Sequence, residues 1–186
     1  MIDTPPVTVK RYHDVDRNAL ASLLRKFGLT ISQTARGRAI PGSFWGDSEA
    51  GLVGNTVHVR DDTPLHSILH EAAHYICMDP IRRESLHTNA GGDYEEENAV
   101  CFLQILMADT LPDSSAEALM ADMDAWGYSF RLGSTKAWFL EDADDAHDWL
   151  IARSIIEHQP NPPHLIKATP LPALTYRLNL ESPADC

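Results

Sequence analysis

The stretch Leu65-His66-Ser67-Ile68-Leu69-His70-Glu71-Ala72-Ala73-His74-Tyr75-Ile76-Cys77 contains an H-E-x-x-H motif at residues 70–74. With about 3.6 residues per helical turn, His70 and His74 lie one above the other on a single helix face. Two imidazoles in this arrangement can bind one metal ion, and Glu71 can accept a proton from a metal-bound water. The pattern predicts a helical metal site with His70 and His74 as ligands and Glu71 as catalytic base.

The residues around the motif favour a well-delimited amphipathic helix. Thr63 and Pro64 occupy the positions of an N-cap and a first-turn proline, and Pro80 follows where the helix must stop. One face is apolar, which gives the helix a side to bury; it carries Leu65, Ile68, Leu69, Ala72 and Ile76. His66 falls one turn before His70, and we expect it to be a hydrogen-bonding neighbour of the ligands or a surface residue.

Composition limits the class of protein. The chain has 186 residues with 44% hydrophobic and 23% charged residues, typical of a globular protein. Its formal net charge of -12 argues against a nucleic-acid-binding surface, which needs clustered Lys and Arg. Three cysteines without a C-x-x-C pair predict no disulfide framework. No segment has the length and apolarity of a signal peptide or a membrane span, so we predict a cytoplasmic protein without membrane contact.

The order of the expected elements predicts an α+β fold that is mostly helical, with a small N-terminal sheet before the H-E-x-x-H helix. We expect a catalytic domain over residues 1–158 and a proline-rich tail over 159–186, extended and packed through Leu171, Leu174, Tyr176 or Leu178. The patterns predict a helix that is capped by Asp14 or Asp16 and ends near Phe27, and further helices over 93–107, 114–127 and 134–158. The helix over 114–127 is expected to start with a capping box from Ser114 to Glu117. Strands are predicted over 29–34 and 55–60, with an edge segment at 43–46. Residues 43–46 or 55–60 are the candidates for a strand that an extended substrate could pair with.

A catalytic zinc site needs a third protein ligand and an open position for water. The best source is the acidic start of the next helix, Glu95-Glu96-Glu97. Glu96 shares a helix face with Val100, Leu103 and Met107, so we expect Glu96 to point inward and to be the ligand. Glu95 and Glu97 remain the alternatives.

At this point the chain resembles the gluzincin zinc peptidases, and most of all the short ImmA/IrrE-type group. That group pairs H-E-x-x-H with a glutamate on a following helix, in a pattern like E-x-E-A-x-x-F-A-x-x-L-L-M-P. Glu96, Ala99, Phe102 and Met107 keep the relative spacing, whereas Asn98 and Ala108 depart from it. The resemblance spans roughly residues 20–108 and implies a zincin-like fold, a Zn²⁺ cofactor held by His70, His74 and Glu96, and a peptide or protein substrate.

A second resemblance is local. His70-Glu71-Ala72-Ala73-His74-Tyr75 followed by Arg82-Arg83 is similar to the corresponding stretch of elongation factor P hydroxylases, which are oxygenase-type proteins with a metal site. Two histidines and one carboxylate also suit non-haem Fe²⁺. Fe²⁺ is therefore the alternative cofactor.

Three functional hypotheses follow. The first is a zinc metallopeptidase with Glu71 as base and an additional oxyanion donor. His66, His87, Tyr94, Tyr128 and Arg131 are the candidates for this donor or for positioning roles around the metal. The second is a non-haem iron oxygenase with the same ligands. The third is a regulatory domain that keeps the metal for folding. The sequence does not determine the substrate or the oligomeric state.

Overall fold

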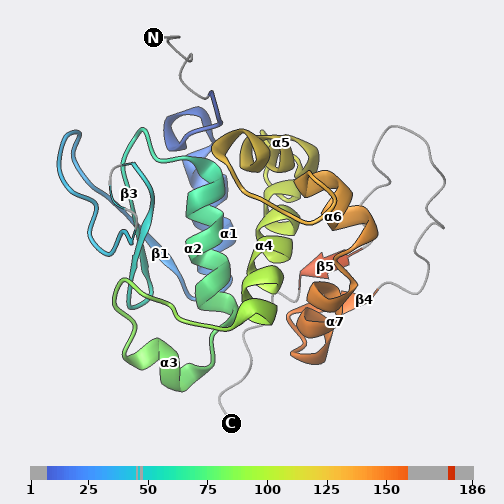
Figure 1. Cartoon of the computed structure of the whole chain (residues 1–186). Coiled ribbons are helices and arrows are strands. Elements are labelled where there is room, and N and C mark those ends of the chain that lie inside the picture. The colour runs from blue at the N-terminus through green and yellow to red at the C-terminus, as the bar shows by residue number, and fades with distance from the viewer. Residues whose placement is uncertain (1–7, 45, 47, 159–175, 179–186) are drawn as a thin grey trace.

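The computed structural model describes residues 8–44, 46, 48–158 and 176–178 and shows an α+β fold (Figure 1). In chain order the elements are a 3₁₀ helix at Tyr12–Asp14, α1 (Arg17–Arg25), β1 (Thr30–Gln33), β2 (Gly51–Val53), β3 (Thr56–Val59), α2 (Leu65–Cys77), α3 (Pro80–Glu84), α4 (Tyr94–Asp109), α5 (Ala116–Trp126), α6 (Thr135–Glu141), α7 (Asp144–Ala152), β4 (Ile156–His158) and β5 (Tyr176–Leu178). One hydrophobic cluster extends from Tyr12 to Ile156. The mostly helical fold with a small sheet before the H-E-x-x-H helix is confirmed.

The sheet has the order β1-β3-β2, with β1 parallel and β2 antiparallel to the central β3. Val57 and Val59 on β3 are fully buried, as their alternation with polar residues predicts. The segment 43–46, expected to be an edge strand, is not a strand at its described residues 43, 44 and 46, and β2 instead lies over 51–53. Gly51 makes this possible because a Cβ at that position would overlap the backbone of Pro41 and Ser43.

The H-E-x-x-H helix α2 begins one residue later than predicted. Pro64 is its N-cap, and no side chain caps the helix. The Thr63 hydroxyl instead accepts a hydrogen bond from the Arg60 backbone N–H at 2.8 Å and closes the turn that leads from β3 into α2. At the other end, Pro80 starts the short helix α3, which the sequence analysis did not predict.

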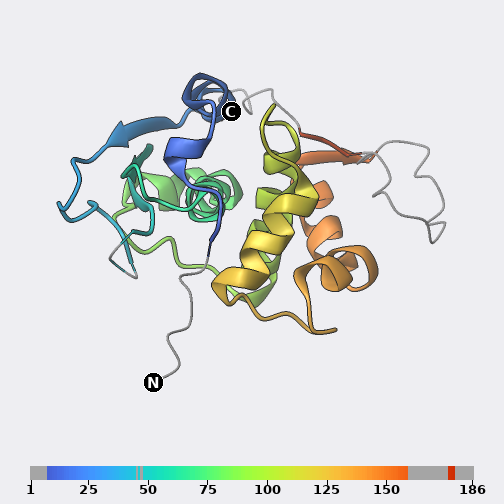
Figure 2. The same cartoon turned by 90° about the horizontal axis from the view of Figure 1, so that it is seen from above.

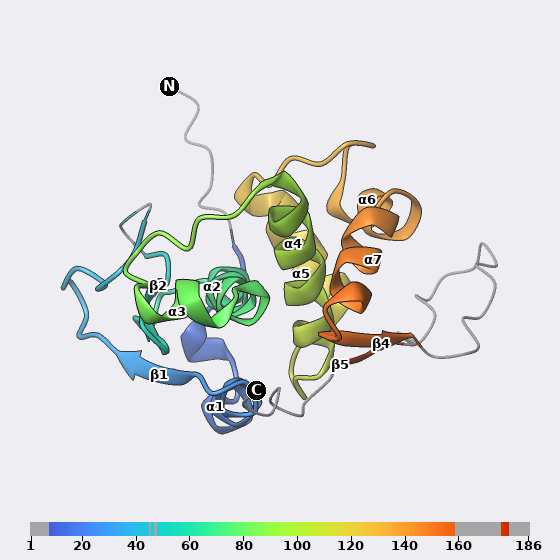
Figure 3. The same cartoon turned by 90° about the horizontal axis from the view of Figure 1, so that it is seen from below.

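Helix α4 is the centre of the helical half, because it packs against α2 on one side and against α5 and α7 on others (Figures 2 and 3). Nearly all its residues from Ala99 to Ala108 are buried, including Gln104. The sheet, α2 and α4 therefore lie in successive layers. Among the residues described, no helix is long and apolar enough to cross a membrane.

The predicted helix over 134–158 is wrong as a single element. It is divided into α6 and α7, and the chain then enters β4. Asp142 leaves the helical conformation at φ -145°, and Arg131 binds its carboxylate, with Arg131 Nε donating at 2.7 Å. Of the expected tail, Tyr176–Leu178 is extended as β5 and pairs antiparallel with β4, while Leu171 and Leu174 lie outside the described residues.

Candidate metal centre

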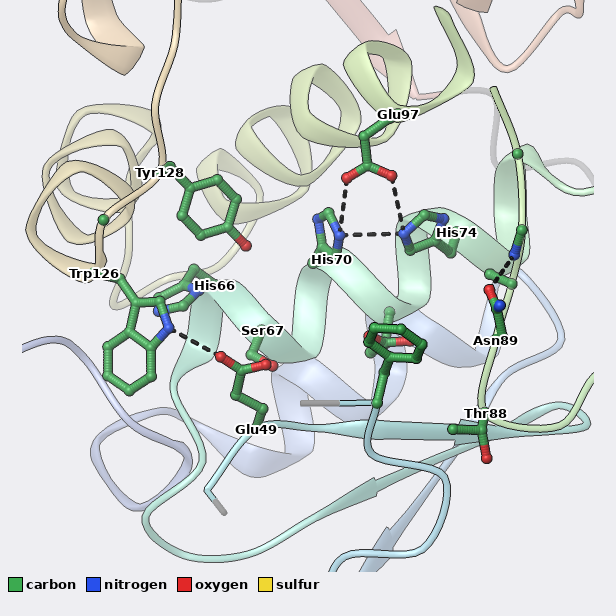
Figure 4. Close-up of a pocket in the computed structure, with 16 residues that line it drawn as sticks. Glu49, His66, Ser67, His70, His74, Thr88, Asn89, Glu97, Trp126 and Tyr128 are labelled. Carbon is green, nitrogen blue, oxygen red and sulfur yellow. Dashed lines mark hydrogen bonds and ion pairs between the residues drawn. The ribbon is translucent and has the colours of Figure 1, made fainter. Parts of the chain in front are cut away.

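Three side chains from two neighbouring helices converge on one point (Figure 4). His70 and His74 extend from α2 with their Nε2 atoms 3.1 Å apart. Glu97 extends from the first turn of α4, with one carboxylate oxygen 3.3 Å from His70 Nε2 and the other 3.4 Å from His74 Nε2. Tetrahedral zinc with bonds of about 2.0–2.1 Å separates its ligand atoms by about 3.3 Å. The two Nε2 atoms, each with one Glu97 oxygen at 3.3–3.4 Å, therefore have a spacing that suits one zinc ion.

The third residue of the cluster is Glu97, one of the two alternatives, so the choice of Glu96 is corrected. Glu96 is buried, as expected, but Arg82 of α3 binds its carboxylate with two hydrogen bonds of 2.7 and 2.9 Å. The prediction assumed that a buried glutamate on this helix would point toward α2 and its histidines. Because α4 is buried nearly all round, the inward direction at Glu96 leads to α3 instead. Glu97, one residue or about 100° further round the helix, faces the histidines.

Electrostatics favour a cation at this point. Burial, and after it the neighbouring His70, lower the pKa of His74 to about 4. Burial also acts to lower the pKa of His70, but Tyr128, Cys101 and Glu97 outweigh it and raise that pKa well above its usual value. Burial acts to raise the pKa of Glu97, whereas the hydrogen bond with His70 brings it below its usual value. In the metal-free cluster the Glu97 carboxylate thus faces a His70 that keeps its proton, and a metal ion at this point would take the place of that proton.

Gln104 orients His70. Its side-chain oxygen lies 2.8 Å from His70 Nδ1, so the imidazole tautomer with hydrogen on Nδ1 donates to it and leaves Nε2 as a metal ligand. The Gln104 amide in turn donates to Met123 of α5 at 2.8 Å. His74 Nδ1 has no such acceptor among the described residues. Gln104 was missed because a lone glutamine in an apolar helix has no recognisable spacing.

We expect Gln104→Leu to weaken zinc binding about 10–100-fold without loss of the fold, because His70 loses the acceptor that fixes its orientation. Competition with a fluorescent zinc chelator measures this affinity. Gln104→Glu keeps an oxygen acceptor and is expected to retain the affinity, and Met123→Leu is the control for core packing. An unchanged zinc affinity in Gln104→Leu would remove Gln104 from a positioning role.

Glu71 lies in the same cleft as the two histidines. Burial raises its pKa to about 7, with smaller contributions from the nearby carboxylates of Glu49 and Glu97. A carboxyl group beside a metal centre and in contact with a substrate-sized cleft is what a general base requires. The structure thus places Glu71 in the cleft that His70 and His74 line, and its role as catalytic base stays a prediction.

The cleft has a volume of about 880 Å³. The lining side chains come from α2, from the end of α5, from the segment 88–92 before α4, and from the loop before β2; they include Phe44, Glu49, His66, Ser67, Thr88, Asn89, Trp126 and Tyr128. Figure 4 shows Trp126 and Glu49 at one end of the cleft and Thr88 and Asn89 at the other, with the metal centre between them. A cavity of this size can hold several residues of an extended peptide.

Two of the five other candidates line this cleft. The Tyr128 ring lies 6.1 Å from the His70 ring, and burial raises the pKa of Tyr128 to about 12. His66 is buried with its ring 5.1 Å from that of Trp126, and burial lowers its pKa to about 3. Both of its ring nitrogens are without a hydrogen-bond partner among the described residues.

The remaining three candidates lie elsewhere. His87 is exposed and its Nδ1 lies 2.8 Å from the Thr88 hydroxyl. Tyr94 is 79% exposed, and Arg131 is paired with Asp142. Tyr94 and Arg131 line a second pocket of about 440 Å³, which shares Glu97 and Tyr128 with the cleft. None of the three lines the metal cleft.

Neither predicted strand is free to pair with a substrate. The 55–60 stretch forms β3, which is central and has β1 and β2 on its two sides. The outer edge of β2 is also occupied, because Thr88 N–H donates to the Leu52 carbonyl at 3.0 Å and Gly54 N–H to the Leu86 carbonyl. The segment 86–88 thus covers the sheet edge, and a substrate in the cleft would meet side chains and the 88–92 segment.

In comparisons with known proteins, no family model, no curated protein and no solved structure matches the chain. The group of His70, His74 and Glu97, which could hold a metal ion in its cleft, is therefore the feature that points to a function.

Proposed function

We propose that the protein is a zinc-dependent peptidase that hydrolyses peptide bonds. The observation that carries this proposal is the convergence of His70, His74 and Glu97 in a cleft of about 880 Å³ that Glu71 also lines. This set supplies three ligands and a carboxylate base, which is the arrangement of hydrolytic zinc sites. The resemblance of the motif to the gluzincin peptidases supports the same reaction class.

Zinc at this position supplies a bound water of lowered pKa and polarises the substrate carbonyl. Glu71 accepts the proton of the attacking water on its carboxylate and then transfers it to the amine nitrogen that leaves. Gln104 holds His70 in the tautomer that presents Nε2. Tyr128, whose pKa is raised to about 12, keeps its hydroxyl proton and can donate a hydrogen bond to the developing oxyanion.

A second candidate function uses the same three residues. Two histidines with Nε2 atoms 3.1 Å apart, and one glutamate with an oxygen 3.3–3.4 Å from each of them, also match the facial triad of non-haem Fe²⁺ oxygenases. In that reaction Glu71 has no role as a base for water attack. The identity of the metal and the need for oxygen distinguish the two reactions.

The experiment that tests the proposal combines metal analysis with cleavage. The protein is purified aerobically and analysed for zinc and iron, and its zinc-loaded form is incubated with a mixture of internally quenched peptides of varied sequence. We expect about one zinc per chain, cleavage of a subset of the peptides, loss of cleavage in a chelator, and recovery when zinc is restored.

Three outcomes contradict the proposal. Stoichiometric iron together with oxygen-dependent modification of a peptide favours the oxygenase. Zinc-loaded protein that cleaves no peptide, and that unfolds in the chelator, favours a metal that serves the fold alone. Cleavage that persists undiminished in the chelator excludes the metal from the reaction.

A further inference from the structure

The end of the cleft beside the N-terminal turn of α2 combines a carboxylate, an imidazole and an indole side chain (Figure 4). Glu49, His66 and Trp126 meet there, from the loop before β2, from α2 and from the last residue of α5. We call these three residues the terminal subsite. His66 precedes His70 by four residues, so the terminal subsite lies about 6 Å along the helix from the metal centre.

Glu49 is a half-buried carboxylate without a basic partner. One of its oxygens accepts a hydrogen bond from the indole N–H of Trp126 at 3.0 Å, and no lysine or arginine is paired with it in the described structure. The cleft lining as a whole contains Glu49, Glu71 and Glu97, but no lysine or arginine among the described residues. Glu97 faces the two histidines at the proposed metal position. The Glu49 carboxylate is therefore the acidic group that a substrate would meet at this end of the cleft.

His66 is an independent observation at the same place. Only 1% of its surface is exposed, and neither ring nitrogen has a hydrogen-bond partner among the described residues. A buried imidazole without a partner costs free energy, and a donor that enters the cleft would remove this cost. The Trp126 ring, 5.1 Å from the His66 ring, adds an aromatic surface that attracts cations.

We propose that the terminal subsite binds a positively charged group of the substrate, an ammonium or guanidinium. A carboxylate, a neutral imidazole acceptor and an indole face together supply charge, hydrogen-bond acceptance and an aromatic contact for such a group. Since a peptide spans about 3.3–3.6 Å per residue, the charged group belongs within about two residues of the bond at the metal centre. The proposal deepens the proposed function, because it takes the cleft to be the peptide-binding site.

Two sources provide this chemistry, a basic side chain and a free N-terminus. Isothermal titration calorimetry on the zinc-loaded full chain separates them with three tripeptide amides: acetyl-Ala-Lys-Ala, acetyl-Ala-norleucine-Ala, and Ala-norleucine-Ala with a free amine. We expect one of the two cationic peptides to bind about 10-fold or more tightly than the acetylated norleucine peptide. The peptide that does so identifies the source of the charge.

The matched variants are Glu49→Gln and Glu84→Gln. Glu49→Gln keeps an acceptor for the Trp126 indole and removes one negative charge, and we expect it to abolish the preference for the cationic peptide while zinc stoichiometry is kept. Glu84 lies exposed on α3, and its replacement removes the same charge without touching the cleft, so the preference is expected to remain.

Equal binding of all three peptides to the unmodified protein overturns the terminal subsite, and so does a preference that persists in Glu49→Gln. These outcomes are separable from failure of the peptidase. A charge preference that depends on Glu49, in a protein that cleaves no peptide, keeps the subsite and rejects the reaction. Cleavage without any charge preference keeps the reaction and rejects the subsite.

Discussion

Replacing Glu97 by glutamine is expected to weaken zinc binding about 100–1,000-fold. Its two carboxylate oxygens lie 3.3 and 3.4 Å from the Nε2 atoms of His70 and His74, and a neutral amide replaces neither the charge nor the basicity of the carboxylate. The binding free energy of a zinc site is roughly 10–16 kcal/mol and is shared among about four ligands. Loss of one ligand therefore corresponds to about 2.5–4 kcal/mol, which is roughly a 100–1,000-fold weaker affinity. The zinc affinity is measured by chelator competition at fixed pH.

The adjacent glutamates are the matched controls for this variant. Glu95→Gln removes an exposed carboxylate and is expected to change nothing. Glu96→Gln is expected to keep zinc but to lower the free energy of unfolding, because Arg82 loses the carboxylate that accepts two of its hydrogen bonds. Loss of zinc in Glu96→Gln together with retention in Glu97→Gln would restore Glu96 as the ligand.

Glu71→Gln is expected to leave one zinc per chain and to lower kcat for peptide cleavage about 100- to 10,000-fold. The substitution keeps the shape of the side chain but removes the carboxylate that accepts the proton of the attacking water. Because Glu71 is not among the three converging donors, the metal is expected to stay bound. The measurement is steady-state cleavage of a peptide identified in the quenched-peptide screen, with zinc determined on the same sample.

The control is Glu84→Gln, which makes the same chemical change outside the cleft and is expected to retain full activity. A Glu71→Gln protein that holds zinc and cleaves at the unmodified rate would reject the proposed role of Glu71. Loss of zinc in Glu71→Gln would instead place this residue among the groups that hold the metal.

Prediction from sequence succeeded where the interaction is local. The spacing of His70 and His74 follows from helical geometry, and the flanking prolines Pro64 and Pro80 predict the limits of α2 apart from the one-residue difference at its start. Asp16 caps α1 through its side chain, as expected for one of its two candidate caps. The helix predicted over 114–127 is α5, although its side-chain cap is Ser115 rather than Ser114. Such features depend on a few residues that are neighbours in the chain.

The sequence-based predictions were wrong where the local structure depends on contacts with residues from another part of the chain. Helical periodicity over 134–158 did not reveal the break at Asp142, because the side chain that holds Asp142 belongs to Arg131 in the preceding loop. The strand β2 was missed because its position depends on the close approach of the 41–43 backbone to Gly51. The covered edge of β2 likewise depends on residues 86–88, more than 30 positions further along the chain.

The sequence by itself determined that two imidazoles and a glutamate share one helix, because α-helical spacing places residues 70, 71 and 74 without help from the rest of the fold. Only the tertiary structure decided which acidic residue completes the centre. All three glutamates of the 95–97 run stand in the first turn of α4, and the rotation of α4 against α2 and α3 turns Glu97 to the histidines and Glu96 to Arg82. The packing of α4 against its neighbours sets that rotation. Because α4 is buried almost all round, its apolar pattern does not define which face turns to α2.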